Sequence, residues 1–199
     1  MSALLDKNST DLSPEMKAAI EALVDARVKE RLAELDGRIE DAALTDRVTM
    51  VVFSGDFDRL FASMIIATGA VAMGMEVSMF FTFWGLMALK NKTIYKGKSF
   101  SEKMVTMMMP KDIQDVGTSK LNMMGMGPKF FRSLMTKHGV ETLPGLFELA
   151  RDMGVKMIAC QMSMGIMGVT KDELFKDLEY GGVATYLGDA GDSKVTLFI

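Results

Sequence analysis

The chain has 199 residues, 49% of them hydrophobic and 25% charged, with a net charge of −3. This length allows one α/β domain plus an appendage, and such a domain buries a core without disulfides or metals. A single cysteine and a single histidine exclude an internal disulfide and a cysteine-based zinc site. Lys and Arg form no block, so we expect no nucleic-acid partner.

The first 45 residues are predicted to form a polar tail and a long amphipathic helix. Ser13, Pro14 and Glu15 suit a helix start, and the helix should run to about Ala43. Its apolar residues recur every three or four positions, as in a coiled-coil seam or in a helix packed on its own domain. We favour an oligomerisation element, followed by a separate domain at residues 46–199. The stripe consists of Met16, Ile20, Leu23, Val24, Val28, Leu32, Leu35 and Ile39.

Residues 60–89 contain only one charged side chain, that of Glu76. A membrane-spanning helix needs about 20 apolar residues, but Gly69, Gly74 and Glu76 divide this run into a helix and a β-branched, aromatic strand. We therefore expect no membrane association, and a spanning segment is the alternative. The N-terminus lacks a basic segment followed by an apolar one, so we expect a cytoplasmic protein.

Strands and helices are predicted to alternate through the second domain. This order is typical of an α/β fold with a mostly parallel sheet. Residues 91–127 are expected to be irregular. A capping box at Thr170–Glu173 should open a further helix. The predicted strands span 47–53, 76–83, 155–159 and 195–199, and the predicted helices begin near 57, 129, 142 and 182.

Ligands of open α/β sheets bind beyond the carboxyl ends of the strands. A cysteine at such a strand-to-helix junction meets free amide groups that favour the reactive thiolate. Cys160 has this place, although a buried, inert cysteine is an equally ordinary interpretation. The candidate pocket around Cys160 comprises Ser54, Gly55, Asp56, Phe83, Trp84, Gln161, Met162 and Ser163.

Methionine is unusually frequent, at 21 residues. Met123, Met126 and Met162 could form a soft apolar wall over the thiol; core filling and Cu(I) binding are the alternatives. We expect neither a resident metal nor a cofactor. Without a second cysteine the thiol cannot complete a disulfide cycle within the chain, but it could still accept sulfur and pass it on.

Several segments resemble the larger DsrE-like proteins, a branch of the DsrE/DsrF/TusD-type sulfurtransferases that is sometimes labelled peroxiredoxin-like. They include VVFSGDFDRL at 51–60, FFTFWGL at 80–86 and ACQMSM at 159–164. The resemblance implies a flavodoxin-like three-layer sandwich and a homo-oligomer. It also implies a persulfide or thiosulfonate on Cys160, exchanged with rhodanese-like or TusA-like proteins. Gly165 replaces an acidic residue usual in the family, which puts any role for a carboxylate there in doubt.

Three hypotheses follow from the sequence. The first is a sulfur carrier or sulfurtransferase that uses Cys160. The second is a non-catalytic oligomeric scaffold, which predicts a buried thiol that reacts slowly with alkylating reagents. The third is a protein that binds a small anionic ligand at the strand ends, which native mass spectrometry would reveal.

Overall fold

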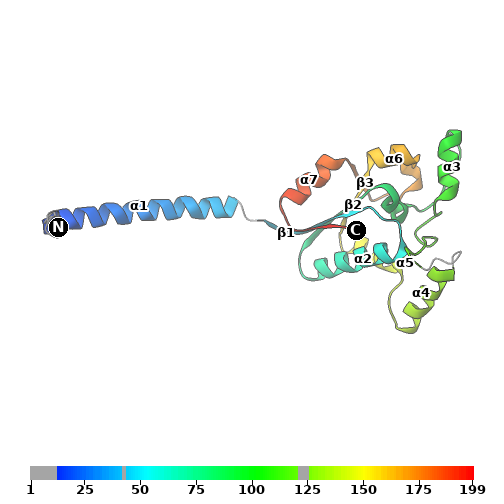
Figure 1. Cartoon of the computed structure of the whole chain (residues 1–199), viewed down its shortest axis with the longest axis horizontal. Coiled ribbons are helices and arrows are strands. Elements are labelled where there is room, and N and C mark those ends of the chain that lie inside the picture. Colours follow the sequence, from blue (N-terminus) through cyan, green and yellow to red (C-terminus); the bar gives the residue numbers. More distant parts are fainter. Residues whose placement is uncertain (1–12, 42–43, 121–125) are drawn as a thin grey trace, which may run out of the picture. The chain divides into compact units, whose positions relative to one another are not determined.

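The computed structural model describes residues 13–41, 44–120 and 126–199 (Figure 1). The chain divides into two compact units, at residues 1–43 and 44–199.

The first unit contains the helix α1, Pro14–Asp41. The Ser13 hydroxyl accepts a hydrogen bond from the Met16 amide at 3.2 Å, as expected of a residue that caps a helix. The expected N-terminal helix is therefore confirmed. The apolar stripe is exposed at each described position, so α1 buries none of it within its own unit. Self-association through this stripe stays a prediction. The exposed members are Met16, Ile20, Leu23, Val24, Val28, Leu32 and Leu35.

The second unit is built on a five-stranded sheet in the order β4-β3-β2-β1-β5. Every pair of neighbouring strands is parallel, which confirms the expected α/β fold. All five carboxyl ends therefore lie along one edge of the sheet. The strands are β1 Thr45–Val52, β2 Glu76–Phe81, β3 Lys156–Cys160, β4 Glu179–Gly181 and β5 Ser193–Phe198.

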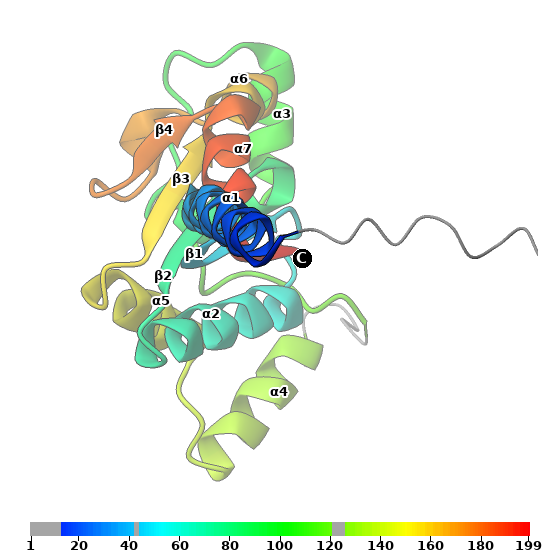
Figure 2. The same ribbon diagram turned by 90° about the vertical axis from the view of Figure 1, so that its left-hand side faces the viewer.

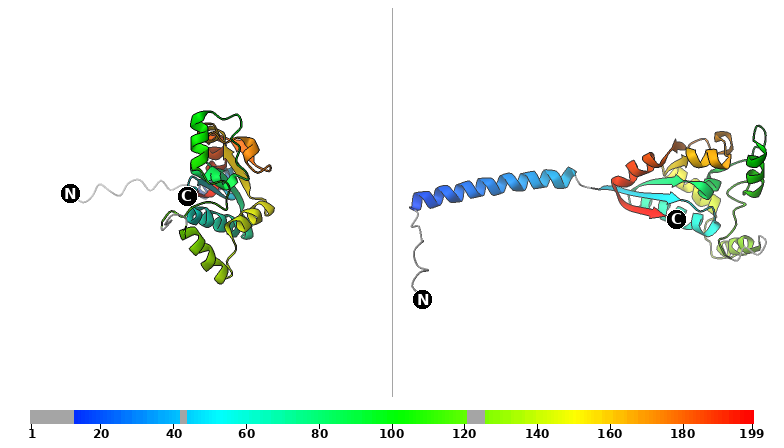
Figure 3. Two further views of the ribbon diagram at one scale, coloured as in Figure 1. Left: turned by 90° about the vertical axis from the view of Figure 1, so that its right-hand side faces the viewer. Right: turned by 45° about the horizontal axis from the view of Figure 1, so that its top comes forward.

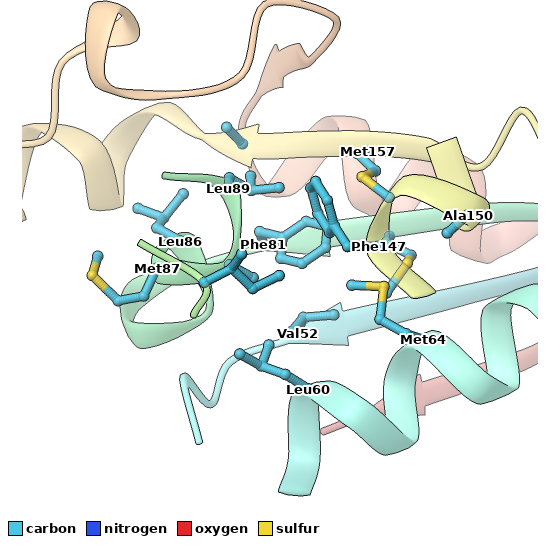
Figure 4. Close-up of a cluster of buried hydrophobic side chains, with 14 of the residues drawn as sticks. Val52, Leu60, Met64, Phe81, Leu86, Met87, Leu89, Phe147, Ala150 and Met157 are labelled. Atoms are coloured by element: carbon cyan, nitrogen blue, oxygen red, sulfur yellow. The ribbon is translucent and has the colours of Figure 1, made fainter. Parts of the chain in front are cut away.

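Helices cover both faces of the sheet (Figure 2). Helices α2, Phe57–Ala72, and α5, Leu143–Asp152, lie on one face, and α7, Val183–Gly191, lies on the other. The large core fills the first face, where alternate residues of three strands meet the two helices. Figure 4 shows part of it, with Val52, Phe81 and Met157 from the strands, Leu60 and Met64 from α2, and Phe147 from α5.

The segment after β2 differs from the sequence-based expectation in two ways. A 3₁₀ helix, Phe83–Leu89, follows the strand directly. Within residues 91–127, which were expected to be irregular, Phe100–Met108 forms α3, capped by a reciprocal pair of hydrogen bonds between Ser99 and Glu102. The expectation was therefore wrong for residues 100–108, because the Ser99-x-x-Glu102 capping box stands before an apolar run and starts a helix.

Helix α4, Met126–Lys137, and α3 stand on opposite sides of the sheet's carboxyl edge (Figure 3). The short helix α6, Gln161–Met167, follows β3 immediately and ends at Gly168, whose positive φ of 64° suits glycine. The capping box at Thr170 is present, but it opens only a 3₁₀ turn, Lys171–Glu173. None of the described helices is both long and apolar enough to cross a membrane.

Candidate functional site

Cys160 is the last residue of β3 and the N-cap of α6. Only 3% of it is exposed. It belongs to a small apolar cluster on the α7 face of the sheet, separate from the large core. The thiol therefore sits in a largely dehydrated place at the carboxyl edge of the sheet. The cluster contains Val51, Phe80 and Ile158, with Phe53 and Tyr186 packed against it.

Two buried hydroxyl groups accompany the thiol. The Oγ1 of Thr82, the residue after β2, lies 2.7 Å from the Oγ of Ser163 in α6. Burial by itself raises the pKa of the Cys160 thiol. The Ser163 hydroxyl and amide, the Thr82 hydroxyl and the Met162 amide together outweigh burial and hold that pKa below its ordinary value. The site therefore favours the thiolate, the nucleophilic form of cysteine.

The proton count of the two hydroxyls shows how they act on the thiolate. Thr82 and Ser163 carry one hydroxyl proton each, the two hydroxyls bond to each other, and both lower the pKa of the thiol. When the sulfur is a thiolate it can only accept, so one hydroxyl donates to the other and the second donates to the sulfur. Such a chain polarises towards the anion and strengthens the terminal hydrogen bond.

Replacing Ser163 with Ala should raise the pKa of the Cys160 thiol, because a donor to the thiolate disappears. A hydrogen bond to a charged group contributes about 1.5–3 kcal/mol, so alkylation by iodoacetamide near neutral pH should slow on the order of tenfold. The midpoint of the pH–rate curve should move to higher pH. Ser63→Ala is the control: Ser63 is equally buried but donates to the Leu60 carbonyl at 2.7 Å. An unshifted curve for Ser163→Ala would contradict this role.

The turns after β1 and β2 touch through their backbones. A methyl group on Gly55 would lie 2.6 Å from the carbonyl oxygen of Trp84, and one on Gly85 would overlap the carbonyl of Val52. The Gly85 amide donates to the Phe53 carbonyl at 2.9 Å. The structure thus brings the predicted segments at 54–56 and 83–84 into contact at the carboxyl edge of the sheet.

Ser54 and Asp56 bond to each other within their turn. The Ser54 hydroxyl donates to the Asp56 carboxylate at 2.9 Å and accepts from the Asp56 amide at 3.1 Å. The Asp56 side chain makes no capping hydrogen bond to α2. The amide of Asp56 is thus engaged within the turn. Participation of this turn in ligand binding stays a prediction.

The remaining predicted pocket residues differ in exposure. Trp84, Met126, Gln161 and Met162 are exposed, while Ser163 is fully buried beside the thiol. Met123 lies outside the described residues. A methionine wall over the thiol therefore stays a prediction, and the contact that the structure gives Met162 at the sulfur comes from its backbone amide.

Phe83 adopts a positive φ of 46°, which is uncommon for an aromatic residue and costs about 1–2 kcal/mol. Its ring packs 5.5 Å from that of Phe53, which in turn stacks on Phe198 at 5.8 Å. Backbone strain of this kind gathers at functional sites. Here it turns the chain sharply after Thr82, whose hydroxyl faces the site.

Sequence reasoning did not identify Thr82 as a site residue. Its only signal was strand alternation: Phe80 faces the small cluster and Phe81 the large core, so the next residue returns to the Cys160 face. In the described part of the chain, no group of three or more His, Cys, Asp or Glu side chains could hold a metal ion.

Comparisons with known proteins find related sequences for the second unit. The model of the DsrE/DsrF/DrsH-like family matches residues 45–198. The protein YrkE of Bacillus subtilis, itself uncharacterized, is 49% identical over 156 residues, or 78% of this chain and 98% of its own. The sulfur carrier protein DsrE2 of Allochromatium vinosum is 32% identical over 155 residues, 77% of this chain and 98% of its own.

Among solved structures, the crystal structure of the ychN protein from E. coli matches with a TM-score of 0.47 and 11% identity, covering 77% of this chain and 98% of that one. From residue 45 to residue 198, and thus across the whole sheet and the Cys160 site, the chain belongs to the DsrE/DsrF/DrsH-like family.

Proposed function

We propose that this protein is a sulfur carrier or sulfurtransferase that holds sulfane sulfur on Cys160, as a persulfide or a thiosulfonate. Rhodanese-like or TusA-like proteins would be its partners. Membership of the DsrE/DsrF/DrsH-like family supports a role in sulfur relay, as does the similarity to a protein named a sulfur carrier.

The observation that carries the proposal is the set of polar groups that lower the pKa of the Cys160 thiol, among them the mutually bonded hydroxyls of Thr82 and Ser163. Two hydroxyls and two amides lower the pKa of Cys160 despite its burial. A cysteine that served only as a small apolar core residue would need none of them. Their presence supports a sulfur anion as the functional state of this residue.

The transfer of sulfane sulfur to and from Cys160 requires no oxidant. The Cys160 thiolate attacks the outer sulfur of a donor R–S–SH, a new S–S bond forms, the donor S–S bond breaks, and R–S⁻ leaves. In the second step an acceptor thiolate attacks the outer sulfur of Cys160–S–SH, and the Cys160 thiolate leaves. The donors that hold the resting thiolate would also stabilise this leaving group. Burial of the sulfur would slow its loss to water and to oxidants.

Mass spectrometry of the purified protein after incubation with hydrogen polysulfide tests the proposal. The wild type should gain the mass of one or two sulfur atoms, and dithiothreitol should remove it. Cys160→Ser should gain nothing, while its circular dichroism and melting temperature should stay close to those of the wild type. Absence of an adduct, together with a Cys160 that resists iodoacetamide in the folded protein, would reject the carrier and leave the scaffold hypothesis.

A further inference from the structure

A cavity of about 310 Å³ lies between α4, the first residue of α2 and the start of α5. Figure 2 shows these three helices on the same side of the sheet. Because α2 follows β1 and α5 leads into β3, both helices begin at the carboxyl edge of the sheet, where ligands of open α/β folds bind. The volume lies within the range of about 300–1,000 Å³ that is usual for small-molecule pockets.

The cavity is separate from the Cys160 site. Its buried lining residues Phe57, Ile113 and Leu143 belong to the large core on the α2 and α5 face, and each is at most 5% exposed. Cys160 belongs to the small cluster on the α7 face. A ligand in this cavity would therefore lie on the other face of the sheet from the thiol, and its binding can be measured without any sulfur chemistry.

The lining of the cavity is mainly apolar. Five of its nine residues have apolar side chains, three have uncharged polar ones, and a single residue, Arg132, is charged. Apolar walls with a few polar groups are typical of sites that bind small organic molecules. The apolar lining residues are Phe57, Ile113, Met135, Leu143 and Pro144.

The guanidinium of Arg132 is held at the cavity but keeps most of its donors free. It lies 5.6 Å from the centroid of the Phe57 ring, and its Nη2 donates to the Gln114 carbonyl. This hydrogen bond uses one of the five N–H donors of the group. Among the described residues, no ion pair involves Arg132.

The carboxylates next to lining residues in the sequence do not neutralise this cation directly. Asp112 accepts a hydrogen bond at 2.7 Å from the amide two residues further along the chain. Glu141 accepts from the amide and the hydroxyl of Thr142, at 2.8 and 3.1 Å, and Asp115 is exposed to solvent. Arg132 can therefore take an anion from outside the chain, and its planar fork suits a carboxylate.

We propose that this cavity binds a small amphipathic carboxylate. The carboxylate pairs with Arg132, and a short hydrocarbon chain lies against the apolar walls. The single cation fits a single negative charge, and the remaining walls offer no counter-ion for a second charged group. This site goes beyond the proposed sulfur chemistry and does not depend on it.

Octanoate is the probe for the first test, with the full-length protein labelled with ¹³C at its methionine methyl groups. Addition of octanoate should shift the signal of Met135, which lines the cavity, along a saturable curve. Met135→Leu assigns that signal. Met104, Met107 and Met108 are exposed on α3 and report non-specific binding. A Met135 signal that does not move, or that moves only in parallel with these three, would overturn the proposal.

The chemistry of the probe gives a second readout on the wild-type protein. From butyrate to octanoate the affinity should rise about fourfold for each added methylene until the cavity is full, because each one buries apolar surface. 1-Octanol should bind on the order of tenfold more weakly than octanoate, because it lacks the charge that pairs with Arg132. Octylammonium should bind more weakly still. Equal affinities for octanoate and octylammonium would contradict the proposal.

A pair of variants of α4 locates the carboxylate. Arg132→Gln should weaken octanoate binding on the order of tenfold and change the affinity for 1-octanol much less. Lys129→Gln is the matched control, because it removes the same charge from an exposed residue one turn earlier in the helix. If both variants weaken octanoate binding equally, Arg132 does not hold the carboxylate and the proposal fails. Circular dichroism of Arg132→Gln checks its fold, and the probe series on the wild type tests the proposal if that variant unfolds.

Discussion

Replacing Gly85 with Ala should destabilise the protein by about 2–4 kcal/mol, as expected for overpacking against backbone. A Cβ at this position would overlap the carbonyl group of Val52, and no side-chain rotation could relieve the overlap. The same carbonyl accepts a hydrogen bond from the Thr82 amide at 3.0 Å. The 3₁₀ helix would have to move away from the end of β1. Because Thr82 starts that turn, the alkylation rate of Cys160 should change as well.

Gly69→Ala is the matched control for this substitution. Gly69 lies inside α2, and a methyl group there would meet nothing within 4 Å. Alanine should therefore stabilise the helix by up to about 1 kcal/mol. Urea denaturation of both variants compares the two methyl groups directly. If Gly85→Ala is no less stable than Gly69→Ala, the result would contradict the close backbone contact between the turns after β1 and β2.

The sheet was predictable because buried parallel strands appear in a sequence as continuous runs of apolar residues. The segments at 47–53, 76–83 and 155–159 were located from such runs, and each contains a strand, with boundaries that differ by up to two residues. The three-residue strand β4 was missed because Glu179–Gly181 is too short to show a pattern. Its register is set by pairing with β3, where Gly181 stands opposite Cys160.

Helix α3 was missed for a different reason. Its apolar residues Phe100, Met104, Met107 and Met108 do recur at helical spacing, but they face solvent. The helix is held through Val105, which packs against the large core, through the buried Thr106, and through Glu102, which lies beside Gly168. In a chain with 21 methionines, a run of methionines gives little indication of which face of a helix packs against the rest of the domain.

The candidate site was predictable only in part. The place of Cys160 at a strand end follows from the order of elements, and Ser163 follows from its position one turn into the next helix. Thr82 could not be found in this way, because its bond to Ser163 joins residues 81 positions apart.

Glu173 lies at the centre of a buried polar network. This network anchors the segment that follows the 3₁₀ helix Phe83–Leu89 and contains Ile94 and Lys98. Glu173 is fully buried and pairs with Lys98 at 2.8 Å. Its carboxylate also accepts from the amides of Ile94 and Thr170, both at 2.9 Å. Burial raises the pKa of this carboxyl, but these hydrogen bonds and the Lys98 charge outweigh burial and hold the pKa below its ordinary value. The ionised form is therefore the one that the fold requires.

Glu173→Gln keeps the shape of this side chain and removes its charge, which leaves the Lys98 ammonium buried without a counter-ion. Removing one partner of a buried pair costs about 3–5 kcal/mol. Urea denaturation near neutral pH should therefore find the variant less stable by roughly that amount. Asp46→Asn, which removes the exposed partner of Lys194, is the control and should change stability by less than about 1 kcal/mol.

The difference in unfolding free energy between the wild type and Glu173→Gln should also depend on pH. Because the pKa of Glu173 is lower in the folded state, its stabilisation is complete above the unfolded pKa of about 4.3. It is lost as the pH falls through the lower folded pKa. The gap in unfolding free energy should therefore narrow as urea titrations are repeated from neutral pH to below about 4. A gap that stays constant, or widens, would show that the buried carboxylate does not hold this segment through its charge.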